Sequence, residues 1–189
     1  SRPEYERFGD VTVVETRVPS SLQSSYELLD HLDEAVVERL KNGKVKQTCD
    51  NWNPRERRWD CGSKDPWLYV GEKRMMVGGD PHKCFWAHPL PKGKVLRITF
   101  PKVPLQKTLR VRAGLSFTAS RKGHGDPVRM RVEIDDETRV DHVYPAHDSV
   151  WRASDIDTAA LSGQRRDVVL KVTAPEIRDR WFCVNGWVN

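Results

Sequence analysis

Long hydrophobic runs are missing from this sequence of 189 residues. No stretch reaches the roughly 18 consecutive apolar residues that a membrane-spanning helix needs. The first residues, Ser1 to Glu4, lack the apolar segment of a secretory signal. A chain that begins at Ser is expected to be a processed or excised piece. We therefore expect it to meet a membrane only through missing parts of a longer parent chain.

Catalytic signatures are also missing. The sequence holds no GxSxG elbow, HExxH helix, phosphate-binding loop or GxGxxG turn. Its 27 acidic residues would always supply a carboxylate pair for glycoside hydrolysis, but no spacing singles out one pair. We predict a domain that is not itself an enzyme, although its parent protein is free to be one. A glycoside hydrolase-like sandwich enzyme is the second alternative.

The charge has no long block of one sign. Lys and Arg number 32 and Asp and Glu 27, which gives a net charge of +5 with the two signs interleaved. This excess permits an anionic partner without requiring one. A basic face is expected if the strands that carry five arginines share one sheet, and scattered arginines are expected if they do not. These residues are Arg97, Arg110, Arg112, Arg129 and Arg131. Nucleic acid is not an expected partner.

Cysteine is scarce, and no CxxC pair occurs. The four residues are Cys49, Cys61, Cys84 and Cys183. Structural zinc usually draws on close pairs, so two disulfides are favoured. Three connectivities are open, of which we favour Cys49–Cys61 with Cys84–Cys183. The alternative is four buried thiols in a cytosolic protein. Disulfides predict an extracytoplasmic location, either periplasmic or at the cell surface.

Metal-ligand spacing is absent too. Two clusters mix His with Asp but match no known zinc pattern, and we interpret them as polar loops. They are Asp80, His82 and His88, and Asp141, His142, His147 and Asp148. We therefore predict no cofactor and no metal in the site. A structural calcium ion is left open, because Asp135-Asp136 or residues 155–157 would supply oxygen ligands.

The N-terminal part, residues 1–48, is expected to pack on the main body. Val11–Arg17 alternates as a short strand does, and Pro19 ends it. Apolar residues then recur at helical spacing, which predicts one amphipathic helix with Gly43 as its C-terminal stop. The stripe consists of Leu22, Tyr26, Leu29, Leu32, Val36 and Leu40.

From Cys49 onward the pattern is mainly β, with Cys49–Asp80 expected as loops and short strands. Apolar and polar residues then alternate within short runs that turn residues separate. The predicted strands are Lys83–His88, Val95–Phe100, Leu109–Leu115, Val128–Ile134, Val168–Thr173 and Trp181–Val188. Strands with one apolar face belong to antiparallel sheets, and two such sheets packed together form a sandwich. We assign residues 49–189 to one β-sandwich domain.

Residues 83–189 resemble a known class in their order of elements. An apolar strand ends at Phe100-Pro101, a second ends at Ala113-Gly114-Leu115, and Trp151 precedes Asp155-Ile156-Asp157. Leu161-Ser162-Gly163 then leads into the strand Val168–Val172. This order resembles the jelly-roll sandwiches of the galactose-binding-domain-like class, which includes many carbohydrate-binding modules.

Two shorter strings, Cys84–Pro89 and Trp181-Phe182-Cys183, look like the soluble C-terminal domains of bacterial membrane glycosyltransferases related to protein mannosyltransferases. This resemblance implies an extracytoplasmic module of a larger membrane enzyme.

The binding hypothesis rests on the tryptophans, of which the sequence has seven. A sugar site needs flat apolar faces together with polar side chains that bond hydroxyl groups. The candidate ligand-binding residues are Trp52, Arg57, Trp59, Asp65, Trp67 and Trp151. In the alternative interpretation these rings only pack loops onto the sandwich, as we expect for Trp86, Trp181 and Trp187.

The sequence therefore predicts a non-catalytic accessory domain that binds a glycan or a lipid-linked sugar. The first alternative is a structural or protein-interaction domain without a ligand. The sequence indicates no oligomeric state.

Overall fold

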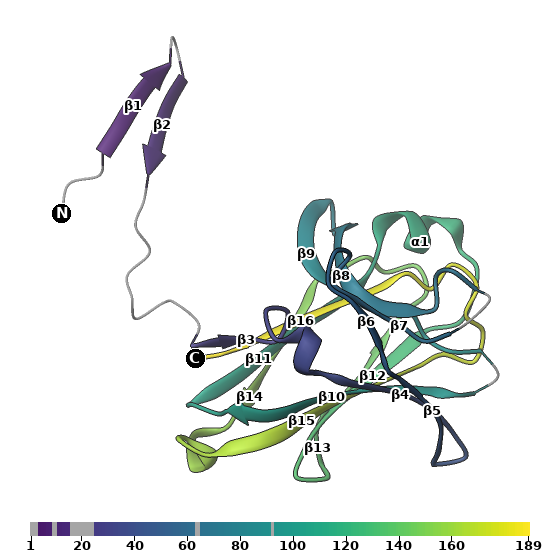
Figure 1. Ribbon diagram of the computed structural model, residues 1–189. Coiled ribbons are helices and arrows are strands. Elements are labelled where there is room, and N and C mark those ends of the chain that lie inside the picture. The colour runs from purple at the N-terminus through teal and green to yellow at the C-terminus, as the bar shows by residue number, and fades with distance from the viewer. Residues whose placement is uncertain (1–3, 9–10, 16–24, 63–64, 92) are drawn as a thin grey trace.

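The computed structural model describes residues 4–8, 11–15, 25–62, 65–91 and 93–189. Two antiparallel sheets account for most of them (Figure 1). In spatial order, the six-stranded sheet contains β13 (Glu137–Tyr144), β12 (Val128–Ile134), β15 (Arg165–Thr173), β10 (Val95–Pro104), β4 (Val36–Lys41) and β5 (Lys44–Cys49).

The second sheet has eight strands. Its order is β14 (Arg152–Asp157), β11 (Thr108–Leu115), β16 (Phe182–Val188), β9 (Asp80–Ala87), β8 (Tyr69–Val77), β7 (Arg58–Asp60) and β6 (Asn51–Asn53), and β3 (Tyr26–Glu27) also pairs with β16. A separate pair joins β1 (Glu4–Phe8) to β2 (Val11–Glu15). The strand predicted over Val11–Arg17 thus begins where we expected, and its last two residues lie outside the described residues.

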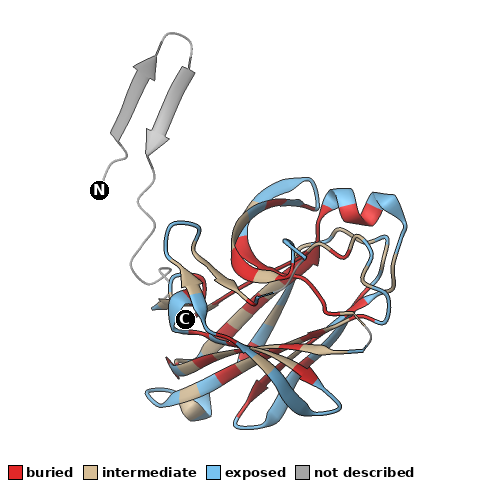
Figure 2. Ribbon diagram, turned by 45° about the vertical axis from the view of Figure 1, so that its right-hand side comes forward, coloured by how far each residue is buried: buried red, intermediate tan, exposed pale blue. Residues whose placement is uncertain are grey.

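The two sheets pack face to face through one hydrophobic core. Along β10 and β12, buried residues alternate with exposed or half-buried ones, as the sequence pattern predicts (Figure 2). Rings from opposite sheets meet in this core. The centroids of Phe85 and Phe100 lie 5.7 Å apart, and those of Tyr144 and Phe182 lie 4.9 Å apart. An antiparallel β-sandwich is therefore the fold.

The predicted N-terminal helix is not present in the part of its span that the structure describes. Residues 25–41 instead form β3, a 3-10 turn η2 (Leu32–Glu34) and β4. Leu22, the first residue of the predicted stripe, lies outside the described residues. The strands β3, β4 and β5 belong to the two sheets, so residues 25–48 are part of the sandwich and do not merely pack on it.

A hairpin turn explains this difference. Asn42 and Gly43 join β4 to β5, and both have positive φ, 52° and 73°. Two-residue turns of this kind require positive φ at both positions and favour Asn-Gly. Gly43 therefore closes a hairpin and does not end a helix. Val36 and Val37 add β propensity just upstream.

One α-helix occurs among the described residues, α1 (Phe117–Lys122). The Ser116 side chain accepts a hydrogen bond from the backbone N–H of Ala119, and Gly123 ends the helix in a left-handed conformation with φ 65°. Such caps satisfy backbone groups that a helix of six residues leaves open. The helix contacts β8 at one end of the sandwich (Figure 1).

Both favoured disulfides are present. Cys49–Cys61 joins the end of β5 to the segment after β7, where the chain passes from one sheet to the other. Cys84–Cys183 joins the neighbouring strands β9 and β16. No free cysteine occurs. The bridges therefore tie a corner of the sandwich and the middle of its larger sheet.

Candidate ligand-binding site

A second hydrophobic cluster lies on the far side of the eight-stranded sheet from the main core. We call it the outer cluster. Its buried members are Met75, Val77, Cys84, Trp86 and Cys183, and Tyr69, Trp151 and Trp181 pack against it. The eight-stranded sheet is therefore covered on both faces at this end.

Beside the outer cluster lies a pocket of about 420 Å³. Ligand pockets for small molecules generally start near 300 Å³, so this volume suits a short saccharide. It is lined by Trp67, His88, Glu176, Ile177, Arg178, Asp179 and Trp181. These residues come from three connections: the one between β7 and β8, the one after β9, and the one between β15 and β16.

Two tryptophans and Ile177 supply the apolar surface of the pocket. Trp67 is 46% exposed, and its backbone carbonyl accepts a hydrogen bond from Nε1 of Trp86 at 2.9 Å. Trp181 is half-buried, and the Lys122 ammonium lies 4.8 Å from its ring centroid. An exposed indole on a fixed backbone is the kind of surface on which a sugar ring stacks.

The buried polar group of the pocket is His88, which is only 4% exposed. Nδ1 lies 2.8 Å from the carbonyl oxygen of Pro89, which can only accept, so Nδ1 carries the proton. In the neutral ring Nε2 is then an acceptor. Burial lowers the pKa of His88 below its usual value, and the nearby positive charge of Arg180 acts in the same direction. The ring is therefore neutral at pH 7.

The carboxylate of Asp179 is held by the side chains of Lys122 and His124. Oδ1 accepts from Lys122 Nζ at 2.8 Å, and Oδ2 accepts from His124 Nδ1 at 3.1 Å. The hydrogen bond from Lys122 lowers the pKa of Asp179 below its ordinary value. Asp179 thus stays ionised at neutral pH. It is suited to accept hydrogen bonds and unsuited to the role of general acid, which needs a raised pKa.

Arg180 holds the loop that carries much of the pocket. It is fully buried, and its guanidinium donates to the carbonyl oxygens of Arg178, Ala146 and Ala119 at 3.2, 3.1 and 3.4 Å. Burial lowers its pKa. These bonds join α1 and the β13–β14 connection to the β15–β16 connection.

The six predicted binding residues do not form one site. Trp67 lines the pocket, and the backbone carbonyl of Asp65 accepts from the N–H of Leu68. Trp151 lies elsewhere, stacked on His82 with ring centroids 4.8 Å apart.

Trp52, Trp59 and Arg57 form a third group. The rings of Trp52 and Trp59 pack against the main core, and Trp59 Nε1 donates to the carbonyl of Leu32 at 2.8 Å. Arg57 Nη2 donates to the carbonyl of Leu29 at 3.0 Å and its Nε to Glu72 at 2.7 Å. Arg57 and Trp59 thus anchor the segment before β4, and the ring of Trp52 packs against that of Trp59.

The Asp-rich turns have structural partners. Asp135 and Asp136, both with positive φ, form the two-residue turn between β12 and β13. Asp155 pairs with Arg110, and Asp157 Oδ1 accepts from the N–H of Ala159. Within the described ranges, no group of three or more His, Cys, Asp or Glu side chains is placed to hold a metal ion. Those ranges also contain no helix that is long and apolar enough to cross a membrane.

The five arginines of the predicted basic face lie on two different sheets. Arg97, Arg129 and Arg131 belong to the six-stranded sheet, and Arg110 and Arg112 belong to the other. Four of them form ion pairs: Arg97 with Glu38, Arg110 with Asp155, and Arg129 and Arg131 with Asp141. The Arg112 guanidinium lies 5.3 Å from the ring centroid of Trp187. No single basic face results.

No protein-family model and no curated protein matches this sequence. Among solved structures, tandem CBM51 modules of a family 98 glycoside hydrolase from Streptococcus pneumoniae are similar, with 12% identity and a TM-score of 0.44 over 96% of this chain and 54% of that one. CBM51-2 and INT domains of Clostridium perfringens ZmpB give 13% identity and a TM-score of 0.40 over 62% of this chain and 24% of that one. A CBM51 from Clostridium perfringens GH95, in complex with methyl-galactose, gives 10% identity and 0.41 over 62% and 77%.

This chain therefore spans less than two thirds of the length of the first two structures. None of the three is described as part of a membrane glycosyltransferase. Likeness at this level identifies no ligand for this chain.

Proposed function

We propose that this chain is a non-catalytic, glycan-binding accessory domain of a secreted or membrane-anchored glycan-processing protein. The observation that carries the proposal is the pocket in which exposed Trp67 and half-buried Trp181 meet buried His88. Stacking faces and convergent polar groups together are what sugar recognition needs.

Each side chain has a distinct role in this proposal. Trp67 stacks on the apolar face of a sugar ring, and Trp181 forms the adjoining wall. His88 Nε2 accepts a hydrogen bond from a sugar hydroxyl, and the ionised Asp179 accepts another. The two disulfides suit an oxidising, extracytoplasmic location. A lipid-linked sugar would present the same ring chemistry.

The alternative is a purely structural domain in which the tryptophans only pack. Residues outside the pocket fit that alternative, but Trp67 does not. Trp52 and Trp59 pack against the core and so have a structural role. Trp67 differs from them, because its exposed fraction of 46% leaves much of the ring in solvent. A ring that served only as core would be buried.

Titration of intrinsic fluorescence with neutral and anionic oligosaccharides, guided by a glycan array, tests the proposal. We expect wild type to bind and Trp67→Ala to lose about fivefold in affinity or more, since a stacked aromatic anchor is worth upward of about 1 kcal/mol. Trp151→Ala is the matched control and should bind as wild type does. Silence of wild type across the array, or equal binding by Trp67→Ala, would rule the pocket out.

A further inference from the structure

The backbone around Trp67 is fixed from two sides. On one side, Trp86 Nε1 donates to the carbonyl of Trp67 itself at 2.9 Å. On the other side, Arg39 Nη2 donates to the carbonyl of the next residue, Leu68, at 2.8 Å. Leu68 is buried, and its N–H closes a turn with the carbonyl of Asp65. The backbone is therefore held while the Trp67 ring remains exposed.

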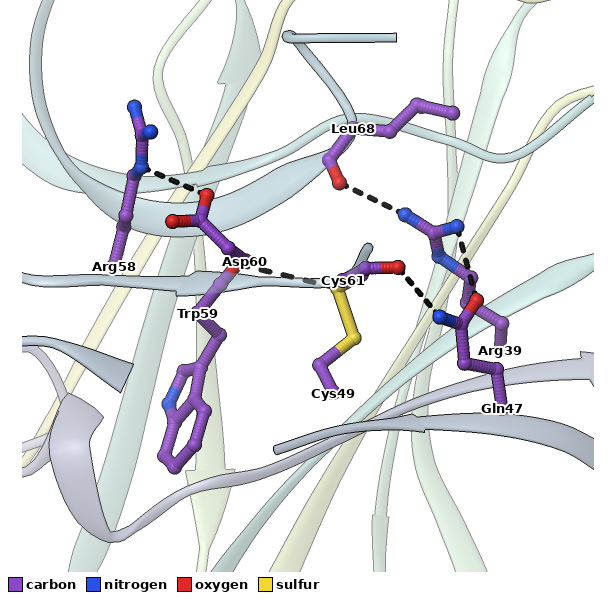
Figure 3. The surroundings of a disulfide bond; sticks show 8 residues. All are labelled: Arg39, Gln47, Cys49, Arg58, Trp59, Asp60, Cys61 and Leu68. Atoms are coloured by element: carbon purple, nitrogen blue, oxygen red, sulfur yellow. Dashed lines mark hydrogen bonds and ion pairs between the residues drawn. A yellow bond between two sulfur atoms is a disulfide. The ribbon is translucent and has the colours of Figure 1, made fainter. Parts of the chain in front are cut away.

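Arg39 links this turn to the Cys49–Cys61 disulfide. Its Nη1 donates to Gln47 Oε1 at 3.2 Å, and Gln47 Nε2 donates to the carbonyl of Cys61 at 2.5 Å (Figure 3). Arg39 and Gln47 face each other across β4 and β5 of the six-stranded sheet. The carbonyls that they hold belong to the connection that leads into β8 of the other sheet. Three hydrogen bonds thus tie β4 and β5 of the six-stranded sheet to the β7–β8 connection of the other sheet.

An arginine suits this position better than other residues. Its planar fork directs two N–H groups at once, so one side chain reaches Leu68 and Gln47 in fixed directions. Arg39 is partly buried, and burial lowers its pKa, while the nearby charge of Asp65 opposes that effect. The bonds to Leu68 and Gln47 therefore act where solvent competes less with them.

We propose that Arg39 is a positioning residue that pre-organises Trp67 for ligand binding. It touches no ligand, and this role rests on the proposed function of the pocket. An anchor that is ordered before binding loses less conformational entropy on binding. Without Arg39 the turn that carries Trp67 keeps the hydrogen bond from Trp86 but loses its hold on the other side, so the ligand must supply part of the ordering of the stacking surface.

Sugar affinity of Arg39→Met and of a matched control tests this role. Arg97→Met is the control, because Arg97 lies on the neighbouring strand β10 and its guanidinium pairs with Glu38 at 2.6 Å, away from Trp67. Both variants should lower the melting temperature. Only Arg39→Met should weaken sugar binding, by about three- to tenfold, the usual cost of ordering a side chain or two. Arg39→Lys should recover part of the loss through a single donor to Leu68.

A double-mutant cycle separates positioning from general damage. In a Trp67→Ala background, Arg39→Met should still lower the melting temperature but should not weaken sugar binding further. An additive loss of affinity would overturn the proposal, because Arg39 would then act through something other than Trp67.

Amide hydrogen exchange provides a readout without a ligand. Exchange at Leu68, whose N–H is bonded to the carbonyl of Asp65, should become several-fold faster in Arg39→Met and stay unchanged in Arg97→Met. Unchanged exchange in Arg39→Met would overturn the positioning role even if wild type binds sugar. If wild type binds none, the glycan-binding function fails, and faster exchange would still support Arg39 as the residue that holds Trp67.

Discussion

Single glycines show how closely the loops around the pocket approach one another. A Cβ placed on Gly125 would lie 2.5 Å from the carbonyl oxygen of Arg178 and 2.8 Å from Arg180 Nε. Gly125 also has φ 74°, which side chains other than glycine rarely adopt. The backbone thus leaves no room exactly where Arg180 ties the β15–β16 connection to its neighbours.

Gly125→Ala is therefore expected to destabilise the fold strongly. Gly163→Ala is the control, because Gly163 has a similar φ of 78° but no atom within 4 Å of its Cβ position. The control should cost about 1 to 2 kcal/mol for left-handed backbone alone. Gly125→Ala should cost clearly more, because Arg178 and Arg180 must move. Urea unfolding measures both, and equal losses would show that the contact with Arg180 does not matter.

Among the individual residues of the pocket, the sequence singled out only Trp67 as a binding residue. Trp67 was predicted as a binding residue because polar residues surround it. His88 was interpreted as part of a polar loop and Trp181 as core, and Asp179 and Arg180 were not singled out. Residues near positions 67, 88 and 176–181 meet only after the chain has folded. The sequence has no local signal for such a meeting.

Among the elements, alternation predicted strands well and short or curved segments poorly. The cores of β10, β11, β12 and β15 lie where apolar residues alternate. The nine-residue β8 was expected only as loop with short strands, because it is buried on both faces at different points and so lacks a clean period. Helix α1 has six residues, too few to show a helical period.

For the predicted N-terminal helix, the sequence has a helical period, but residues 25–41 form β3, η2 and β4. Leu29, Leu32 and Leu40 do recur at helical spacing, and all three are buried. They reach the core from a loop, a 3-10 turn and a strand. Tertiary packing thus reproduced a helical period without a helix, and the Asn42-Gly43 dipeptide was the better local signal.

The two disulfides connect elements at very different separations along the chain, 12 and 99 residues. In the loop-entropy model, a bridge that closes about 100 residues restricts the unfolded chain more, by roughly 4.7 kcal/mol against about 3 for a short loop. Replacing both Cys84 and Cys183 by Ala should therefore lower the free energy of unfolding more than replacing Cys49 and Cys61. Chemical denaturation of the two double variants measures this.

Removal of the Cys49–Cys61 disulfide should also have a local effect on ligand binding. Because Cys49–Cys61 lies in the same network as Arg39, its removal should also weaken sugar binding. A larger loss of stability from the Cys49–Cys61 variant would contradict the entropy argument and would indicate strain or residual structure in the unfolded chain.

The outer face of the six-stranded sheet carries a row of acidic and basic side chains. Adjacent strands place Asp141, Arg131, Lys171, Arg97 and Glu38 in one row across it. The ends of the row are acidic and its middle is basic. At the edge of the same sheet, β5 carries Lys44 and Lys46, which hinder pairing with another strand. This face of the six-stranded sheet therefore carries charges of both signs.

Carboxylates with lowered pKa values and the buried His88 make stability depend on pH in two steps. Hydrogen bonds from Arg129 lower the pKa of Asp141 from 3.8 to about 2, and hydrogen bonds from Arg110 and Lys122 lower the pKa values of Asp155 and Asp179. Carboxylates with depressed pKa values stabilise the fold above pH 4, and this contribution is lost as the pH falls toward 2. His88 acts at higher pH. Burial lowers its pKa below 6.5, so acidification below that value protonates the unfolded chain first and favours unfolding.

Stability should therefore be highest above about pH 6.5, fall in a first step below it, and fall again between about pH 4 and 2. Urea unfolding across this range measures both steps. His88→Gln should remove the upper step and keep the lower one, because the glutamine does not titrate. Asp141→Asn should shrink the lower step alone. The lower step should also shrink at high salt, since its ion pairs are near the surface, whereas the upper step depends on burial and should not. A single step that His88→Gln leaves unchanged would mean that the histidine is solvated in the folded protein, and the pocket would then lack its buried acceptor.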